Sequence, residues 1–598
     1  MLKKFFLNTL SSFVGAWLAL VLVVVSSMIL LFGMIGSGIA SEMGDAEQLK
    51  SKSILTIDLS GAISERESAK APDFTSLVKG NLNKPQNLNV IVEALEEAAR
   101  NRNISAVYLK CGALEASPAA CYAIRQAVLK YKKSGKQVYA YADTYTTGTY
   151  LIASAADRVY MNPQGMMEMQ GMSSTVLYYK DLLDKLGVEF QVVKVGTFKS
   201  AVEPYIMNSM SDPARAQMDT LLGNMWGVIK KNISETRKGV SPEEIDSLVS
   251  KEYISFAPAK TSVEAGLVDS LAYERTINAK FAALTGQDVD DVNFVSPGTL
   301  VKQVPWSTAY DSNNRIAVLY AVGEINDVSQ DGINYHNLVP IITELADDDN
   351  VKGMVLRVNS PGGSAFGSDQ IGEALDYFQS KGKPLAVSMG AYAASGGYWI
   401  SAGADKIFAN PLTITGSIGI FGLIPNVRGL ADKLGVNPQT VSTNPNAQFP
   451  SLTESMTDEM KGVMQQYVDR GYEDFVGRVA KGRKMSVQAV KRIAEGRVWD
   501  AVSAKRIGLV DSIGSLNDAI EWVASKAKIL DKYNVAAYPE YKPSFWDMLP
   551  SNLSSMTAMR QMLEPKPEEM MIMKMRELLR RERIQARMAD IKIEFTGK

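Results

Sequence analysis

Gly148-Thr-Tyr-Leu-Ile-Ala-Ser-Ala-Ala-Asp-Arg-Val-Tyr-Met-Asn-Pro163 returns later in the chain as Gly396-Gly-Tyr-Trp-Ile-Ser-Ala-Gly-Ala-Asp-Lys-Ile-Phe-Ala-Asn-Pro411. The match continues without a gap at a shift of 248 residues, and residues 147–199 share 16 identities in 53 positions with residues 395–447. Unrelated stretches of this length share only a few identities. The chain therefore contains an internal duplication, and each copy is expected to be one structural unit.

Shorter matches on both sides show how far the two copies extend. Residues 54–63 resemble residues 316–325, and Gly266-Leu-Val-Asp-Ser270 recurs as Gly508-Leu-Val-Asp-Ser512. Turn and linker residues between the copies mark the boundary. We therefore predict four parts: 1–45, a cytoplasmic N-terminus with a membrane anchor; 46–297, the first copy; 298–540, the second copy; and 541–598, a Met-rich basic tail, expected to be helical from Met556 onward.

Short β-branched runs alternate with helical stretches inside each copy. In the second copy, residues 317–319, 354–358 and 385–389 are apolar runs, whereas residues 370–380 and 458–481 have helical character. This alternation is typical of βαβ units and a mainly parallel sheet. The predicted fold class is therefore α/β, and a chain of 598 residues is long enough for two such domains.

The N-terminal region has the pattern of a membrane anchor. No charged residue occurs between Lys4 and Glu42, and residues 13–35 are almost continuously apolar. About 20 such residues cross a bilayer as a helix, and positive charge before the segment favours a cytoplasmic N-terminus. A cleaved signal ending at Gly38-Ile-Ala40 is the alternative, but signal cores span only ~7–15 residues. A retained anchor is favoured.

Composition excludes several classes of site. A net charge of −1 gives no overall attraction to nucleic acid. The chain has one histidine, His336, so a metal site built from several imidazoles is excluded, and we predict no metal and no cofactor. His336 lies in a polar stretch, residues 331–337, that is expected to be a loop before a helix, where a surface or capping role is favoured. Cys111 and Cys121 are expected to be two buried thiols.

Two glycine-rich turns follow strands of the second copy: Asn359-Ser-Pro-Gly-Gly363 and Met389-Gly-Ala-Tyr-Ala-Ala-Ser-Gly-Gly-Tyr398. A serine before a helix lies near free backbone N–H groups, an arrangement that suits a nucleophile with an oxyanion hole. Tight strand–helix connections would look similar. However, the first copy has Thr147 in place of Ser395, and Ala113-Leu-Glu-Ala116 in place of the first glycine turn. A turn that is needed only for folding should persist in both copies, so a turn that is present in one copy alone indicates a functional role.

A serine hydroxyl needs a base, and with a single histidine a neutral lysine is the practical choice. Lys199 has apolar neighbours on both sides in the sequence, and its counterpart in the second copy is Ala447. The copy with the serine thus lacks this lysine, and the copy with the lysine lacks the serine. An exposed surface lysine is the alternative, which this complementarity disfavours.

Three segments carry a family resemblance: residues 389–398, Thr415-Gly-Ser-Ile-Gly-Ile420 and Gly196-Thr-Phe-Lys-Ser-Ala-Val-Glu-Pro204. Together they resemble the long, duplicated form of bacterial signal peptide peptidase A, also called protease IV. The resemblance extends from the anchor to about residue 535. It implies two tandem ClpP/crotonase-like domains in a homotetramer that is tethered to the lipid bilayer of the bacterial inner membrane, with the catalytic domains on the periplasmic side.

The resemblance also implies site residues and substrates. Ser395 would be the nucleophile of a serine endopeptidase and Lys199 its general base. Ser417 would hydrogen-bond the lysine amine, and the backbone N–H groups of Gly396 and of Gly362 or Gly363 would form the oxyanion hole. The implied substrates are remnant signal peptides and similar apolar peptides. Two alternatives remain: a crotonase-like acyl-CoA enzyme, although CoA is rarely met beyond the membrane, and a catalytically inactive membrane scaffold.

Overall fold

The computed structural model describes residues 49–66, 85–251, 253–302, 313–327, 332–444, 446–540, 584–590 and 593–595. The predicted anchor, residues 13–35, lies outside this set, as do residues 541–583 of the tail. Within the described ranges, no helix combines the length and the apolar character needed to span a bilayer. Apart from Leu49, the described residues belong to one compact unit, which includes both copies.

A seven-stranded sheet lies at the centre of the first copy, in the order β2-β1-β3-β4-β5-β8 with β9 also paired to β1. Every pairing in it is parallel. Its strands are β1 (Ser53–Ser64), β2 (Gln86–Asn87), β3 (Ile104–Glu115), β4 (Gln137–Thr146), β5 (Arg158–Glu168), β8 (Ser270–Leu271) and β9 (Phe294–Val295). Helices α3 (Leu88–Arg100), α4 (Pro118–Lys132) and α5 (Thr147–Ala153) pack in sequence, and α11 (Glu274–Thr285) buries Ile277 and Phe281 against Tyr108 and Tyr141 of the sheet.

The second copy repeats this plan in an eight-stranded sheet, in the order β19-β17-β15-β13-β10-β21, with β16 paired to β15 and β20 paired to β16. Its strands are β10 (Arg315–Val322), β13 (Val351–Ser360), β15 (Leu385–Ala394), β16 (Lys406–Ala409), β17 (Ile414–Gly416), β19 (Val498–Asp500), β20 (Ser512–Ile513) and β21 (Asn534–Tyr538). Among the pairings of these strands, only β17–β19 is antiparallel. Nearly every residue of β13 and β15 is buried, as expected for parallel strands covered on both faces.

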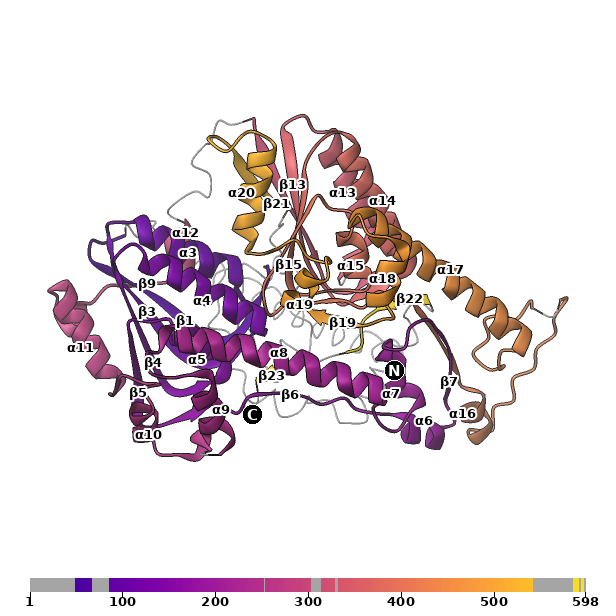
Figure 1. Cartoon of the computed structure of the whole chain (residues 1–598), viewed down its shortest axis with the longest axis horizontal. Coiled ribbons are helices and arrows are strands. Elements are labelled where there is room, and N and C mark those ends of the chain that lie inside the picture. Colours follow the sequence, from indigo (N-terminus) through magenta and orange to yellow (C-terminus); the bar gives the residue numbers. More distant parts are fainter. Residues whose placement is uncertain are drawn as a thin grey trace, which may run out of the picture. The chain divides into compact units, whose positions relative to one another are not determined.

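Helices cover both faces of this second sheet (Figure 1). On one face lie α13 (Tyr335–Asp347), α14 (Ala365–Ser380), α15 (Gly396–Ser401) and α17 (Asp458–Gly482), whose apolar side chains share a core with Leu356 and Val387. On the other face, α20 (Leu516–Lys526) packs on Val318 and Val355. The helices predicted at residues 370–380 and 458–481 are confirmed within α14 and α17.

Equivalent hydrogen bonds show that the duplication extends to side-chain detail. The Tyr150 hydroxyl donates to the Leu267 carbonyl at 2.7 Å, and its counterpart Tyr398 donates to the Leu509 carbonyl at 2.9 Å. A carboxylate repeats in the same way: Asp269 accepts from the backbone N–H of Val159, and Asp511 accepts from that of Ile407. Each of these aspartates also pairs with an arginine, Arg237 in the first copy and Arg483 in the second.

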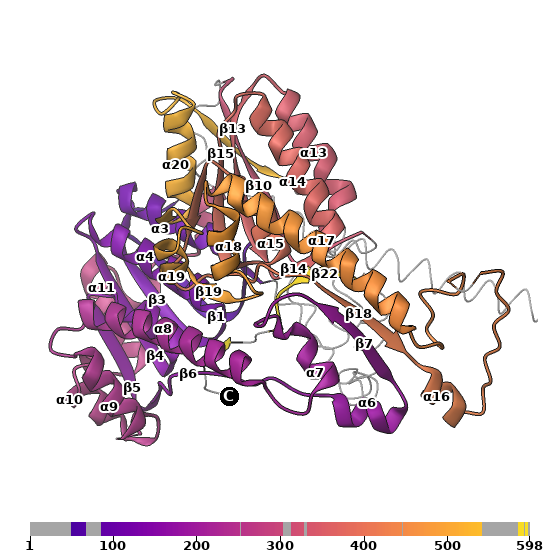
Figure 2. The same cartoon turned by 45° about the vertical axis from the view of Figure 1, so that its right-hand side comes forward.

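A third sheet, with six strands, joins the two copies. Its order is β12-β11-β14-β22-β18-β7, where β7 (Glu189–Lys194) comes from the first copy and β18 (Phe421–Asn426) from the second. These two strands pair antiparallel over their whole length, side by side in Figure 2. The other members are β11 (Ile325–Asn326), β12 (Ile333–Asn334), β14 (Gly362–Ser364) and β22 (Ile584–Arg587). The loop that follows β7 carries Lys199, so this sheet positions that loop at the second copy.

One expectation from the sequence is wrong in the structure, and two element boundaries differ from those expected. The described part of the tail forms strands, not helix: β22, and β23 (Ile593–Phe595), which pairs antiparallel with β6 (Met172–Ser174). Pairing with strands on both sides outweighs helical propensity, because propensity is a weak preference that tertiary contacts override. The turn and linker residues expected at 295–299 overlap the start of α12 (Pro297–Lys302), which has proline at its first position. A helix follows the polar stretch, as expected, but α13 begins at Tyr335 rather than after residue 337, and residues 333–334 form β12.

Candidate active site

Ser395 lies between the end of β15 and the start of α15, and its side chain is fully buried. Its backbone has φ 54° and ψ −117°, a conformation that residues other than glycine rarely adopt. The backbone N–H of Ser395 donates to the Gly416 carbonyl at 2.7 Å, which holds this geometry. Strained backbone of this kind concentrates at functional sites, where the surrounding fold maintains it.

The counterpart of Ser395 in the first copy differs in both conformation and contacts. Thr147 is the first residue of α5, and its φ is not positive. Its hydroxyl is buried and has no hydrogen-bond partner among the described residues. The duplicated sequence therefore produces the nucleophile-like geometry only in the second copy.

Lys199 ends the loop that follows β7, and only 1% of its surface is exposed. Its Nζ lies 2.8 Å from Oγ of Ser395 and 3.1 Å from both Oγ and the carbonyl oxygen of Ser417. Burial lowers the pKa of this amine well below its usual value, because desolvation disfavours the charged form. A neutral amine at this distance can accept the serine proton. The structure thus brings together Ser395, Lys199 and Ser417.

A loop of the second copy, residues 495–497, holds the lysine loop in place. The Glu495 carboxylate accepts hydrogen bonds from the backbone N–H and the hydroxyl of Thr197, at 3.0 and 3.1 Å, and its carbonyl accepts the Phe198 N–H at 2.9 Å. A Cβ on Gly496, which has a positive φ, would lie 2.7 Å from Cβ of Lys199. Only glycine allows so close an approach. The backbone carbonyl of Arg497, in the same loop, accepts a hydrogen bond from the Ser417 N–H at 2.7 Å.

Sequence reasoning missed this loop. Its residues give no recognisable motif, and Ala-Glu-Gly-Arg would pass for an ordinary turn after a helix. The one available signal was Gly496 itself, because a glycine after a helix indicates either a helix end or a close approach of another backbone.

The predicted oxyanion glycines lie beside Ser395. A Cβ on Gly362 would lie 2.7 Å from the backbone nitrogen of Gly396, so Gly362 and Gly396 are near neighbours. The N–H of Gly362 already donates to Oγ of Ser360 at 3.1 Å. Gly363 pairs with Ala586 of β22 instead. Of the two glycines left open by the sequence, Gly362 thus has its N–H occupied within its own turn.

The remaining candidates lie apart from this cluster. His336 is exposed in the first turn of α13, with its ring 4.1 Å from that of Tyr335. Cys111 and Cys121 are buried free thiols, as predicted, and burial raises the pKa of Cys121 to about 12. Within the described ranges, no group of three His, Cys, Asp or Glu side chains is arranged to hold a metal ion.

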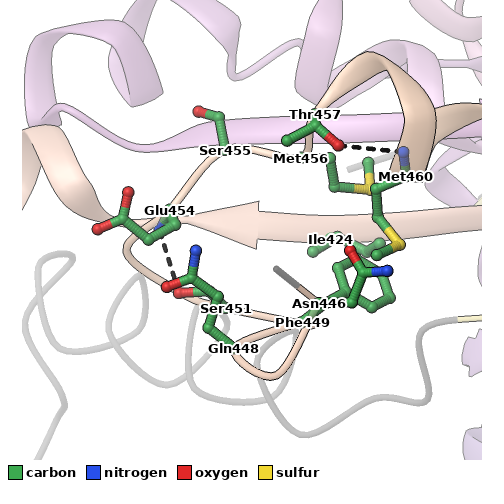
Figure 3. A pocket seen from close by; sticks show the side chains of 10 residues that line it. All are labelled: Ile424, Asn446, Gln448, Phe449, Ser451, Glu454, Ser455, Met456, Thr457 and Met460. Carbon is green, nitrogen blue, oxygen red and sulfur yellow. Dashed lines mark hydrogen bonds between the residues drawn. The ribbon is translucent and has the colours of Figure 1, made fainter. Parts of the chain in front are cut away.

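An open pocket lies at the far end of β18. Figure 3 shows the side chains that line it, including Ile424 of β18, with hydrogen bonds from the Glu454 N–H to Ser451 and from the Met460 N–H to Thr457. Neither Ser395 nor Lys199 lines this pocket. It therefore adjoins a strand of the third sheet without being part of the buried serine–lysine cluster.

Comparisons with known proteins identify a family and several relatives. The family model described as "Peptidase family S49" matches residues 130–288 and 377–530. Protease 4 of Haemophilus influenzae is 36% identical over 486 residues, 79% of this chain and 78% of that protein. Protease 4 of Salmonella typhi is 34% identical over 561 residues, 90% of this chain and 88% of that protein. Among solved structures, a ClpP1 variant of Listeria monocytogenes covers 34% of this chain and 94% of its own, at 16% identity and a TM-score of 0.24.

Proposed function

The chain belongs to peptidase family S49 and is a serine peptidase, and we propose that it hydrolyses peptide bonds with Ser395 as nucleophile and Lys199 as general base. The family resemblance read from the sequence is confirmed, which leaves the acyl-CoA enzyme and the inactive scaffold without support. One observation carries the proposal: two buried side chains, contributed by different copies, lie 2.8 Å apart between Nζ and Oγ.

The reaction begins when Lys199 Nζ takes the hydroxyl proton of Ser395 and Oγ attacks the carbonyl carbon of the substrate. Negative charge then develops on the carbonyl oxygen, where the N–H groups of Gly396 and Gly363 would stabilise it. Collapse breaks the peptide bond, and the lysine ammonium gives its proton to the leaving amine. Water repeats the sequence on the resulting ester, losing a proton to Lys199 and releasing the acid and Ser395.

Ser417 positions the amine in this scheme. Its Oγ and its carbonyl oxygen both lie 3.1 Å from Nζ, so two acceptors orient the amine while its lone pair points at Ser395. The backbone of Ser417 has a positive φ of 51° and is fixed by its hydrogen bond to Arg497. Burial lowers the pKa of the Lys199 amine, because desolvation disfavours its charged form.

We also propose the biological setting that the sequence suggests. Residues 13–35 would anchor the chain in the inner membrane, residues 46–297 and 298–540 would form the two copies beyond it, and four chains would assemble. The substrates would be remnant signal peptides, since an anchored peptidase with a buried dyad suits short apolar peptides. Resistance of the full chain to extraction from membranes at alkaline pH would support the anchor, and release into the supernatant would count against it.

A serine-reactive acylating probe tests the catalytic assignment. Incubation of the full chain with the probe, followed by peptide mapping, should give one adduct, on Ser395. The Ser395→Ala chain should give none, and the Lys199→Ala chain should react far more slowly. An adduct on another serine in the wild-type chain would overturn the proposal.

A further inference from the structure

The strand that leads to Ser395 contains a bulge shortly before that residue. In the ladder between β13 and β15, the register shifts after the pair Val358–Met389, because residues 390–392 of β15 all lie opposite Asn359. Bulges change the direction of a strand and of the side chains that follow, and they are common next to active sites. The shape of this bulge therefore helps to decide where the serine hydroxyl lies.

Two side chains of the second copy hold the bulge from within that copy. Oδ1 of Asn359 accepts a hydrogen bond from the backbone N–H of Tyr392 at 3.1 Å. The hydroxyl of Thr413 donates to the carbonyl oxygen of Gly390 at 2.6 Å. Backbone groups that the bulge removes from the ladder are thus paired with side chains, as buried polar groups must be.

The first copy also holds the bulge, through Glu65, the residue directly after β1. Its carboxylate accepts three hydrogen bonds from Arg357 of β13, at 2.8, 3.0 and 3.1 Å, and the two side chains are 7% and 10% exposed. The same guanidinium donates to the Met389 carbonyl at 3.1 Å and to the Ser388 hydroxyl at 2.9 Å. Arg357 thus connects a carboxylate of the first copy to the backbone at which the bulge begins.

Glu65 contacts the bulge directly as well. A Cβ on Gly390 would lie 2.6 Å from Oε1 of Glu65, so the carboxylate occupies the space that a side chain would take. The backbone of Glu65 is fixed by Asn89 of α3, whose amide donates to the Glu65 carbonyl at 3.1 Å and to the Tyr320 hydroxyl of the second copy at 2.7 Å. Glu65 is therefore held in one place against the bulge.

The equivalent position of the first copy carries a different pair. Lys110 follows residues 104–109 as Arg357 follows the matching residues 351–356. Lys110 pairs at 2.7 Å with Glu274 of its own copy, and these side chains are 48% and 39% exposed. The strand that leads to the nucleophile thus has a buried pair between the copies, where its duplicate has an exposed pair within one copy.

We propose that Glu65 is a positioning residue of the peptidase, which acts through Arg357 and the bulge of β15 to hold Ser395 within reach of Lys199. This inference rests on the proposed function, because it concerns the same nucleophile. The backbone of Ser395 has an unfavourable positive φ, and such a conformation persists only where its surroundings maintain it. The first copy therefore supplies both the base and a contact that aims the nucleophile.

Glu65→Gln tests the proposal in the purified full chain. The amide keeps the size of the side chain, but it is uncharged and its nitrogen cannot accept a hydrogen bond, so the forked pair with Arg357 is lost. In a fluorogenic peptide assay, kcat should fall by about 10- to 100-fold with KM nearly unchanged. The rising limb of the pH profile should stay in place, because the surroundings of Lys199 are unchanged. Glu274→Gln is the matched control and should have wild-type kinetics.

Gly390→Ala tests the same contact without changing any charge. Its methyl group would take the place of Oε1 of Glu65 and displace the carboxylate, so kcat should fall as it does in Glu65→Gln. Gly477→Ala in α17 is the control, because no atom lies within 4 Å of the added Cβ, and it should have wild-type kinetics. Wild-type kcat in the Gly390→Ala chain would contradict the proposal, also if Glu65→Gln failed to fold.

The acylating probe separates positioning from stability. Loss of stability alone would lower the fraction of chains labelled at completion, whereas a misplaced Ser395 is labelled more slowly in every folded chain. If Glu65→Gln is labelled at the wild-type rate, the positioning role is wrong and the peptidase assignment stands. If the probe does not label Ser395 in the wild-type chain, the proposed function itself fails.

Discussion

Lys199 Nζ and Ser395 Oγ lie 2.8 Å apart, although 196 positions separate the two residues in the chain. The lysine belongs to the first copy and the serine to the second, and the pairing of β7 with β18 brings the two segments together. Each copy lacks the residue that the other supplies, since Thr147 and Ala447 occupy the equivalent positions. The duplicated chain therefore builds one proposed site from two copies, and five predictions test its parts.

Ser395→Ala should abolish peptide cleavage while leaving the fold intact. Loss of the nucleophile in a hydrolase that uses serine costs roughly 10⁴- to 10⁶-fold in kcat. The substitution removes one buried oxygen from a turn of small residues, so the thermal unfolding midpoint should change little. Hydrolysis of a fluorogenic peptide by the purified variant is the measurement, and substantial residual turnover would refute the assignment of the nucleophile.

Lys199→Ala should lower kcat by roughly 10²- to 10⁴-fold, as expected when a general base is lost. Lys199→Arg should not restore activity, because a guanidinium keeps its proton at any usable pH and cannot act as a base. Comparison of the two variants in the same peptide assay separates a need for positive charge from a need for a base. An active Lys199→Arg chain would contradict the general-base role.

The pH profile should rise through one ionisation. Only the neutral amine can take the serine proton, and burial holds the pKa of Lys199 well below its usual value of ~10.4. The rate should therefore increase with pH and level off once pH exceeds this lowered pKa. His336→Ala is the control: it should leave the rate and the rising limb unchanged, because His336 is exposed on α13. A shift of the limb in that variant would identify histidine as the base.

Glu495→Ala should slow catalysis without removing any group of the dyad. Glu495 accepts two hydrogen bonds from Thr197, two residues before Lys199, so its loss frees the lysine loop. Misplacement of a catalytic group by about 1 Å can cost roughly 10²-fold in rate. The expected change is a lower kcat with KM nearly unchanged. Glu473→Ala, which removes an exposed partner of Lys491, is the control and should have wild-type kinetics.

Glu65→Ala should destabilise the contact between the copies. Its carboxylate forms a buried, forked pair with Arg357, with hydrogen bonds of 2.8, 3.0 and 3.1 Å. Removal of one partner of a buried pair leaves the other charge unpaired, which costs about 3–5 kcal/mol. Glu97→Ala, whose partner Arg100 is exposed, should cost less than about 1 kcal/mol. Equal thermal unfolding midpoints for the two variants would show that the Glu65–Arg357 pair contributes no more than a surface pair.

The sequence by itself determined the duplication, the α/β class and the two residues of the proposed dyad. Parallel strands and covering helices follow from local hydrophobic patterns, which a chain carries in its residue order. Ser395 and Lys199 could be singled out because the two copies serve as an internal comparison: Thr147 and Ala447 stand where the other copy keeps its functional residue. Such differences can be read without any knowledge of distance.

Only the tertiary structure decided what approaches the site from distant parts of the chain. The loop at Glu495 and Gly496 and the insertion of Ile584–Arg587 between β14 and β18 have no local signature. The tail is an example. Its residues suggested a helix, but the edges of β14 and β18 offer backbone N–H and C=O groups that β22 pairs with. Those groups come from residues more than 150 positions away along the chain, and backbone groups left unpaired in a buried sheet are costly. Their pairing therefore overrode the local preference.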